Sequence, residues 1–245
     1  MLTVTNIEKC PRCGGVDIVK NGFTRHGNQR IYCKTCEKSP VLHRKQASLA
    51  QLKELSRAFL ERLSLRGVSR VFAVSYYQVF KQLNLTCLLL PDFKTQVKGY
   101  RSGEEVLEFD ELCSFCGRKK NKQWLWAALC RSTRQIVGYA IGDRSENTFK
   151  RLLRKIPIKY LKGRSFSDYW KSYRMLLCKG NHTQVGKESG ETNHIERWNA
   201  TLRARITRYV RKSLSFSRKL KYHHLVTKLF IIHYNQDCCN MNLVP

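Results

Sequence analysis

Three acidic residues that lie far apart in the chain, Asp110, Asp168 and Glu196, could together bind divalent metal ions. Glu196 is the only acid between Thr192 and Gln236, in a region rich in Arg and Lys. Carboxylates without basic partners repel one another, and two Mg²⁺ ions (or Mn²⁺) would remove that repulsion. A pair of such ions stabilises the attacking and leaving oxygens when a phosphodiester is displaced. The three acids are therefore candidate metal ligands and catalytic residues.

Two of these acids also have an ordinary structural interpretation. Glu196 follows Asn193 by three residues, which is the spacing of a capping box at the start of a helix, and this role does not exclude metal binding. Asp168 could instead be a counter-charge in a surface salt bridge, which contributes little stability. Both alternatives stay open at this point.

A second candidate metal site lies near the N-terminus. Cys10-Pro11-Arg12-Cys13 and Cys33-Lys34-Thr35-Cys36 are two C-x-x-C pairs, a strong zinc signal at this separation. Four thiolates complete a closed tetrahedral site, so we predict one structural Zn²⁺ in a zinc ribbon over residues 1–45, with short strands at 16–20 and 29–32. The alternative is reduced cysteines without metal.

The elements that position the acids can be predicted from hydrophobic periodicity. An apolar stripe predicts a helix that begins near Asn193 and carries Glu196; it consists of Ile195, Trp198, Leu202, Ile206 and Tyr209. Arg203, two turns after Glu196, would lie on the flank of this stripe that Glu196 occupies. We expect Asp110 to end a strand that starts at Val106, and Asp168 to end a later strand.

The order of elements predicts the fold of the C-terminal part. Residues 124–130 and 136–141 read as two strands joined by a hairpin, and a helix over 145–153 with Ser145 as its cap follows. Three antiparallel strands, then helix, strand and helix is the order of the ribonuclease-H-like fold, in which the strands that carry the acids are neighbours. We therefore expect a ribonuclease-H-like α/β catalytic domain with a mixed sheet over residues 104–236, and a tail over 237–245.

Between the ribbon and this domain, residues 46–84 read as helices. A first helix is expected from Leu49 to a C-cap at Gly67, and Ser75 and Gln78 form a capping box that starts another. The order resembles a helix-turn-helix, although a small helical bundle has the same pattern. In a helix-turn-helix the residues facing DNA would be Tyr76, Tyr77, Gln78 and Lys81. Residues 85–103 read as a linker. The fold class is thus multidomain α+β.

The charge of the chain points to a polyanionic partner. Lys and Arg number 46 against 18 Asp and Glu, a formal net charge of +28. Covering phosphates releases counterions, so nucleic acid is the leading partner. The alternatives are a ribosome or an anionic membrane surface. We expect no membrane span, no secretory signal and a cytoplasmic, nucleoid-associated protein.

The remaining cysteines and histidines have simpler interpretations. Cys113 and Cys116 follow Asp110, and a second metal site there would need partners. Cys130 and Cys178 are too scattered to supply them, so we expect buried thiols. His223, His224 and His233 fall on a predicted C-terminal helix as packing or surface residues, and His194 is given no role.

Several motifs together resemble bacterial transposases of the insertion sequence 1 family, and the resemblance covers nearly the whole chain. They are DEL at 110–112, GDRSENTF at 142–149, SDYWKSY at 167–173, HIERWNATLRARI at 194–206 and RKSLSFS at 211–217. Cys113 and Cys116 depart from the aromatic and apolar residues expected after Asp110.

The resemblance implies an Asp-Asp-Glu transposase. Asp110, Asp168 and Glu196 would be the metal-binding triad, and Arg203 would contact a phosphate near the scissile bond. The protein would bind the terminal inverted repeats of an insertion sequence, free 3′-hydroxyls and join them to target DNA, as a homodimer or larger assembly on double-stranded DNA. The alternatives are a non-catalytic DNA-binding regulator, an inactive transposase relic, or a nuclease that acts on RNA–DNA hybrids.

Overall fold

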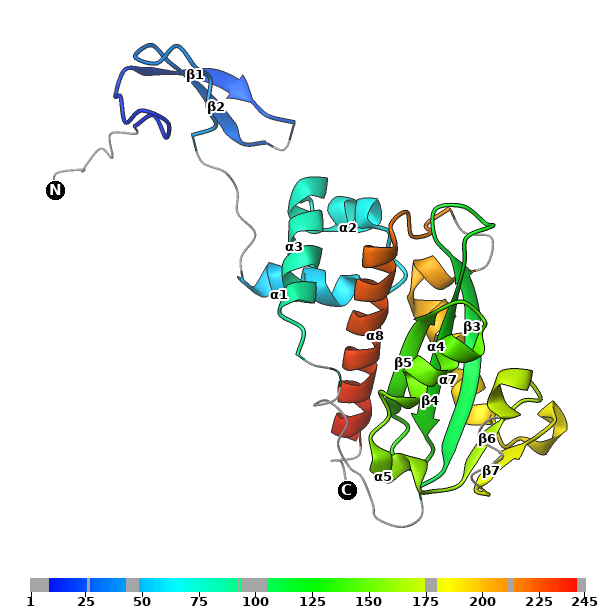
Figure 1. Cartoon of the computed structure of the whole chain (residues 1–245). Helices are drawn as coiled ribbons and strands as arrows, with labels where there is room; N and C mark the ends of the chain where they lie inside the picture. Colours follow the sequence, from blue (N-terminus) through cyan, green and yellow to red (C-terminus); the bar gives the residue numbers. More distant parts are fainter. Residues whose placement is uncertain are drawn as a thin grey trace. The chain divides into compact units, whose positions relative to one another are not determined.

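The structure, a computed structural model, describes residues 9–25, 27–42, 49–91, 93, 105–174, 180–210 and 214–241 (Figure 1). The chain divides into two compact units, one comprising Met1–Arg57 with Leu65–Gln82 and the other Ala58–Ser64 with Leu83–Pro245. Each unit is described by itself. Among the described residues, no helix has both the length and the apolar character needed to cross a bilayer.

The first unit begins with a two-stranded hairpin. Strand β1 (Ile18–Phe23) pairs antiparallel with β2 (Gln29–Cys33), and Ile18 lies opposite Cys33. Both strands lie close to the ranges predicted from sequence. Gly15 is needed beside the first cysteine pair, because a Cβ there would lie only 2.7 Å from the hydroxyl oxygen of Thr35.

Helices α1 (Leu49–Ala58), α2 (Leu65–Val71) and α3 (Tyr76–Leu88) follow the hairpin. The expectation of one helix from Leu49 to a cap at Gly67 is wrong: α1 ends at Ala58, and Gly67 lies buried inside α2. Arg62, with a φ of 54°, takes the intervening turn out of the helical conformation.

The predicted capping box at the start of α3 is confirmed. The Ser75 hydroxyl accepts from the Gln78 backbone N–H at 3.2 Å, and the Gln78 side chain accepts from the Ser75 N–H at 3.2 Å. Helix α3 continues to Leu88, so residues 85–88 are helical rather than linker. Residues 94–103 of the expected linker lie outside the described residues.

A five-stranded mixed sheet organises the second unit, in the order β5-β4-β3-β6-β7. Strands β3 (Leu107–Phe115), β4 (Lys122–Cys130) and β5 (Ile136–Gly142) are antiparallel, as predicted, whereas β6 (Ser165–Ser167) and β7 (His182–Gln184) run parallel to β3. Strand β7 was not predicted. Strand β3 extends beyond Asp110, so the expectation that Asp110 ends the strand is wrong.

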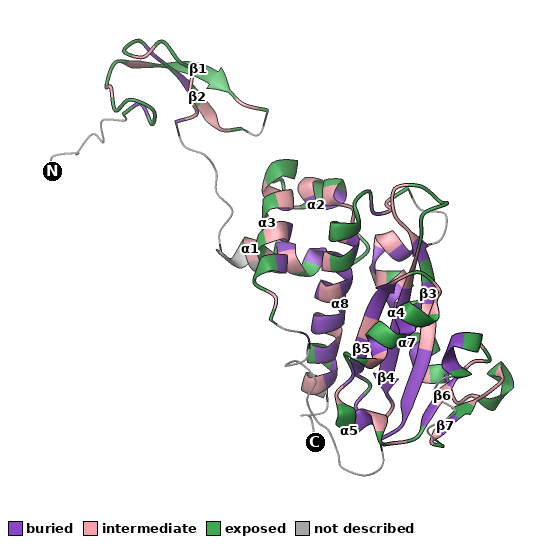
Figure 2. Ribbon diagram, in the orientation of Figure 1, coloured by how far each residue is buried: buried purple, intermediate pink, exposed green. Residues whose placement is uncertain are grey.

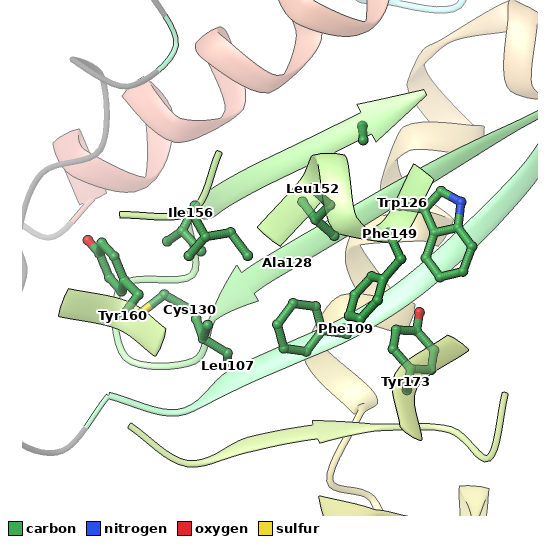
Figure 3. Packing of buried hydrophobic residues seen from close by; sticks show 12 residues of the cluster. Leu107, Phe109, Trp126, Ala128, Cys130, Phe149, Leu152, Ile156, Tyr160 and Tyr173 are labelled. Carbon is green, nitrogen blue, oxygen red and sulfur yellow. The ribbon is translucent and has the colours of Figure 1, made fainter. Parts of the chain in front are cut away.

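Helices cover both faces of this sheet. Phe109 packs against Phe149 of α4 (Glu146–Leu153) and Tyr173 of η2 (Lys171–Tyr173), with ring centroids 5.8 and 6.2 Å apart. This aromatic core extends to Tyr160 of α5 (Ile158–Leu161) (Figure 3). The neighbouring Glu108 contacts α7 (Asn193–Arg205), and successive strand residues point to opposite faces. Helix α7 therefore lies on the face opposite α4.

Helix α8 (Leu220–Met241) packs beside α7, because Trp198 contacts the rings of Phe230 and Tyr234. Its buried Asn235 side chain bonds both the N–H and the carbonyl of Ile136 on edge strand β5, at 2.8 and 2.9 Å. The helix ends at Met241, beyond the start of the expected tail at residue 237.

The apolar stripe predicted around Glu196 is buried throughout, and so are most residues of the central strands, which are largely purple in Figure 2. Of its five members, Ile195, Trp198 and Leu202 lie on α7, whereas Ile206 is the C-cap of that helix and Tyr209 lies in the short helix η4 (Thr207–Tyr209), so the predicted helix ends earlier than expected. The stripe thus fixes which side of the helix faces the sheet. The predicted cap of α4 is also present, since the Ser145 hydroxyl accepts from the Thr148 N–H.

Candidate active site

A cluster of three carboxylates lies at the centre of the sheet. Asp110, Glu111 and Asp168 each place an oxygen within 4.8 Å of the other two. Two of these residues, Asp110 and Asp168, were predicted as site residues, and the structure brings them together. Glu111 was not predicted, and Glu196 is not a member of the cluster.

The sheet register explains why the two aspartates meet. Glu108 on β3 lies beside Phe166 on β6, and these strands are parallel. Asp110 lies two residues beyond Glu108, and Asp168 lies two residues beyond Phe166, so both aspartates reach the same level of the sheet. Strand β6 ends at Ser167, just before Asp168. Because β6 covers the edge of β3 no further, carboxylates from both faces of β3 can approach Asp168.

The cluster carries negative charge that the protein compensates only in part. Burial raises the pKa of Asp110 to about 7, and the charges of Glu111 and Asp168 contribute to the rise. Asp110 also accepts a hydrogen bond from the Asn199 amide at 2.6 Å, and this bond opposes the rise in its pKa. A divalent cation would relieve this repulsion, and an all-oxygen donor set is what Mg²⁺ and Mn²⁺ prefer. The residues therefore fit such an ion.

Glu111 is held on the aromatic side of the sheet. Its side chain is 2 % exposed and accepts from the Tyr173 hydroxyl at 2.7 Å. Arg144 donates to the other oxygen from Nε, at 2.8 Å, and from Nη2. Burial raises the pKa of Glu111, and the hydrogen bonds from Tyr173 and Arg144 oppose that rise. Among the residues that the structure describes, only Glu111 of the three acids is thus paired with a cation.

Glu196 lies on α7 one turn before Asn199, the residue that contacts Asp110. Residues three apart on a helix have Cβ atoms about 5–6 Å apart, so Glu196 lies on the side of α7 that borders the cluster. Its exposed carboxylate accepts from the Thr192 hydroxyl at 3.0 Å. Arg203, two turns further along, is partly buried.

The cap of α7 differs from the capping box expected at Asn193 and Glu196. The N-cap residue is Thr192, whose side chain caps no backbone N–H. Instead, the carboxylate of Glu108 accepts the N–H groups of His194 and Ile195, each at 3.0 Å. Helix N-termini bind anions because their first N–H groups lack intrahelical partners. Glu108 therefore connects the strand of Asp110 to the start of the helix that carries Glu196.

Glu108 is fully buried and has further partners. Arg131 donates to it from Nε at 2.8 Å, and His194 Nδ1 lies 2.7 Å from the same oxygen. Arg131 also binds Glu191, two residues before α7 starts, at 2.8 Å. Burial raises the pKa of Glu108, and the donors from Arg131 and α7 counteract the effect. Sequence inspection had assigned no role to Glu108 or His194.

The four predicted zinc ligands also come together. The Sγ atoms of Cys10, Cys13, Cys33 and Cys36 all lie within 4.8 Å of one another. The separations are 3.9 Å between Cys10 and Cys36 and 3.6 Å between Cys13 and Cys33, and none of the four is in a disulfide. Four thiolates at such distances fit a tetrahedral Zn²⁺.

The residues predicted to face DNA lie in the first two turns of α3. Tyr76, Tyr77 and Lys81 are exposed, and Tyr77 is 72 % accessible. Tyr76 stacks on Phe80 with ring centroids 6.4 Å apart. Gln78 is partly buried, because its side chain completes the capping box with Ser75.

The remaining cysteines only partly match the expectation of buried thiols. Cys130 is buried, but Cys113 is exposed and Cys116 is partly exposed. Cys113 points to the face of β3 opposite that of the buried Leu112 and Ser114 and is exposed there. Cys178 lies outside the described residues. On α8, His223 is buried and His224 is exposed.

Comparisons with known proteins single out the same part of the chain. A family model described as "IS1 transposase" matches residues 105–236. The chain is 38 % identical over 126 residues to insertion element iso-IS1n protein InsB of Shigella dysenteriae, covering 51 % of this chain and 93 % of that protein.

Two further relatives agree. Insertion element IS1 protein InsB of Shigella flexneri is 35 % identical over 133 residues, covering 52 % of this chain and 95 % of its own length. Insertion element IS1 4 protein InsB of Escherichia coli (strain K12) is 34 % identical over 138 residues, covering 54 % and 80 %. A solved structure of the simian T-cell lymphotropic virus intasome in complex with PP2A regulatory subunit B56 gamma contains a chain that aligns with 61 % of this chain and 57 % of its own length. The two chains are 12 % identical in sequence, and the TM-score of 0.30 is too low to support an argument.

Proposed function

The chain belongs to the IS1 transposase family, and from that premise we propose that it is a transposase that cuts DNA at the ends of an insertion sequence and joins them to a target. The observation that carries this proposal is the meeting of Asp110 on β3 with Asp168, which directly follows the adjacent parallel strand β6, and with a third carboxylate within 4.8 Å. A phosphodiester displacement assisted by metal ions needs such a group of acids.

The sheet supports the assignment of a ribonuclease-H-like catalytic domain. Three antiparallel strands are followed by helices and two parallel strands, and β3 lies at the centre. This order places the acid on the first strand beside the acid that follows the fourth. Helices on both faces keep the strands in register around the site.

We assign Asp110 and Asp168 as metal ligands, with Glu196 as the third member of the triad. Two Mg²⁺ or Mn²⁺ ions, when bound, would polarise the phosphodiester and favour ionisation of the attacking hydroxyl group or water. Asn199 would keep Asp110 oriented, as its hydrogen bond at 2.6 Å indicates. Glu196 would turn from the Thr192 hydroxyl toward the cluster, and Arg203 would contact a phosphate near the scissile bond.

The N-terminal unit would supply recognition of the element ends. We propose that the four cysteines bind one structural Zn²⁺ and that α2 and α3 act as a helix-turn-helix whose Tyr76, Tyr77, Gln78 and Lys81 face DNA. The family model does not extend to these residues, so this assignment stands on the cysteine cluster and the exposed side chains. Because two element ends must be brought together, we propose a dimer or larger assembly on DNA.

Asp168→Asn tests this function. In a strand-transfer assay with Mg²⁺ and element-end DNA, the variant should lose both cleavage and joining and still bind the DNA. Glu146→Gln is the matched control, because Glu146 is an exposed acid on α4 outside the cluster. Cleavage by Asp168→Asn at the wild-type rate would refute the site. A wild-type protein that binds but never cuts would be a regulator or an inactive relic.

A further inference from the structure

Arg144 occupies an unusual place at the edge of the carboxylate cluster. It lies between the end of β5 and the cap of α4, and its guanidinium makes cation–π contacts with two indole rings. The guanidinium carbon is 3.7 Å from the ring centroid of Trp170 and 4.6 Å from that of Trp124. Trp170 is itself connected to the site, because its backbone N–H donates to the Asp168 carboxylate at 3.0 Å.

The hydrogen bonds of Arg144 use only one edge of the guanidinium. Nε and Nη2 both donate to Oε1 of Glu111. Within the described part of the chain, Nη1 makes no hydrogen bond to protein, and the side chain is 34 % exposed. A guanidinium has five N–H donors in a fixed plane. Arg144 therefore keeps donors within reach of solvent while its hydrogen bonds to Glu111 and its contacts with the two rings hold it in place.

A residue that only balanced the charge of Glu111 would need neither the contacts with two indole rings nor a guanidinium edge that faces away from Glu111. Glu111 already accepts a hydrogen bond from Tyr173, and a mobile lysine would balance its charge equally well. A guanidinium that contacts two aromatic rings is suited to binding a ligand in a defined orientation through its planar set of donors. Phosphate oxygens are such a ligand, and they bind Arg through paired hydrogen bonds.

We propose that Arg144 binds a phosphate of the DNA strand that lies at the carboxylate cluster, at or next to the scissile phosphodiester. The inference rests on the proposed function and adds to it a substrate-binding residue. Three clustered carboxylates repel a phosphodiester, so a fixed cation at their edge offsets that repulsion and orients the strand. Trp124 and Trp170 position Arg144 for this contact.

A cycle of double changes on protein and DNA tests the contact. Duplexes carry one neutral methylphosphonate, placed at the scissile phosphate or at either neighbour. Affinity is measured by fluorescence anisotropy in Ca²⁺, and cleavage of the unmodified duplex by wild type is scored in Mg²⁺. At one position we expect the neutral linkage to weaken wild-type binding about 10-fold or more, and Arg144→Gln to weaken binding similarly. When Arg144→Gln and the neutral linkage are combined, the loss of affinity should be no larger than the loss from either change alone.

Arg154→Gln is the matched control, because Arg154 is an exposed arginine at the end of α4. The loss of affinity that Arg154→Gln causes should multiply with the loss that each methylphosphonate causes. If Arg144→Gln unfolds, Arg144→Lys takes its place in the cycle, because lysine keeps the charge but lacks the planar set of donors. If the losses of affinity from the Arg144 change and from the methylphosphonate multiply at all positions for both Arg144 variants, the inference is overturned. Cleavage by wild type would still uphold the transposase proposal in that case. Failure of wild type to cut would overturn both.

Discussion

Replacing Glu108 with alanine should strongly destabilise the second unit and loosen the start of α7. The fully buried carboxylate accepts the N–H groups of His194 and Ile195 and a charged hydrogen bond from Arg131. Removing it leaves these donors without their acceptor where water has little access. A buried donor without a partner costs about 1–3 kcal/mol, and breaking a buried ion pair costs about 3–5 kcal/mol.

Arg131 retains its ion pair with Glu191, so the penalties do not simply add, and we expect the free energy of unfolding to fall by roughly 3–5 kcal/mol. This loss should lower Tm by about 6–20 °C. Glu108→Gln keeps the volume and one acceptor, so its loss should be nearer about 1–3 kcal/mol. The control is Glu146→Ala, which removes only an exposed ion pair with Lys150 and should change stability by about 0.5 kcal/mol or less.

Urea unfolding followed by tryptophan fluorescence is the assay, since all four tryptophans, Trp124, Trp126, Trp170 and Trp198, belong to the second unit. Hydrogen exchange should also become faster at the amides of His194 and Ile195 in Glu108→Ala. A stability within about 1 kcal/mol of wild type, or unchanged exchange at these two amides, would refute the assignment of Glu108 as the cap of α7.

Three other predictions concern pH, zinc and DNA. Burial lowers the pKa of His223 to about 4, so the unfolded chain binds more protons between about pH 6.5 and 4 and stability falls by up to about 3 kcal/mol as the pH drops through this window. His223→Gln should lose less stability than wild type between pH 7 and pH 4.5, and an equal loss would contradict this. Chelation should release one Zn²⁺ per chain and expose the thiols of Cys10, Cys13, Cys33 and Cys36 to a thiol reagent, leaving the tryptophan unfolding transition unchanged; protein that contains no zinc when purified would refute the ribbon site. Tyr77→Ala should weaken binding to element-end DNA by about 5- to 100-fold without a change in Tm, whereas unchanged affinity would remove α3 from the DNA interface.

Periodicity within the sequence predicted most elements of the second unit. The apolar runs of β4 and β5, which are buried along most of their length, and the apolar stripe that begins on α7 are local sequence patterns, and the structure confirms the elements that they predict. The helices before this unit were less predictable. Hydrophobic spacing continues through residues 59–64, but the first helix ends at Ala58, and the positive φ of Arg62 in the turn that follows has no strong sequence signal.

The contacts that complete the site were harder to predict because they are distant in sequence. Glu108 caps a helix that begins 85 residues later, and nothing near Glu108 in the sequence indicates this partner. Glu111 is one of five acids between Glu104 and Glu111, and only the end of β6 at Ser167 shows that it reaches Asp168. Asn199 could have been found, since a polar residue within an otherwise buried helix stripe requires a partner.

The most direct test of the central claim is an anomalous diffraction measurement on crystals of the protein grown with Mn²⁺. We predict a peak within about 2.0–2.3 Å of carboxylate oxygens of both Asp110 and Asp168, and its loss in Asp168→Asn. A map without a peak between these two aspartates, in crystals whose Mn²⁺ occupies other sites, would contradict the account.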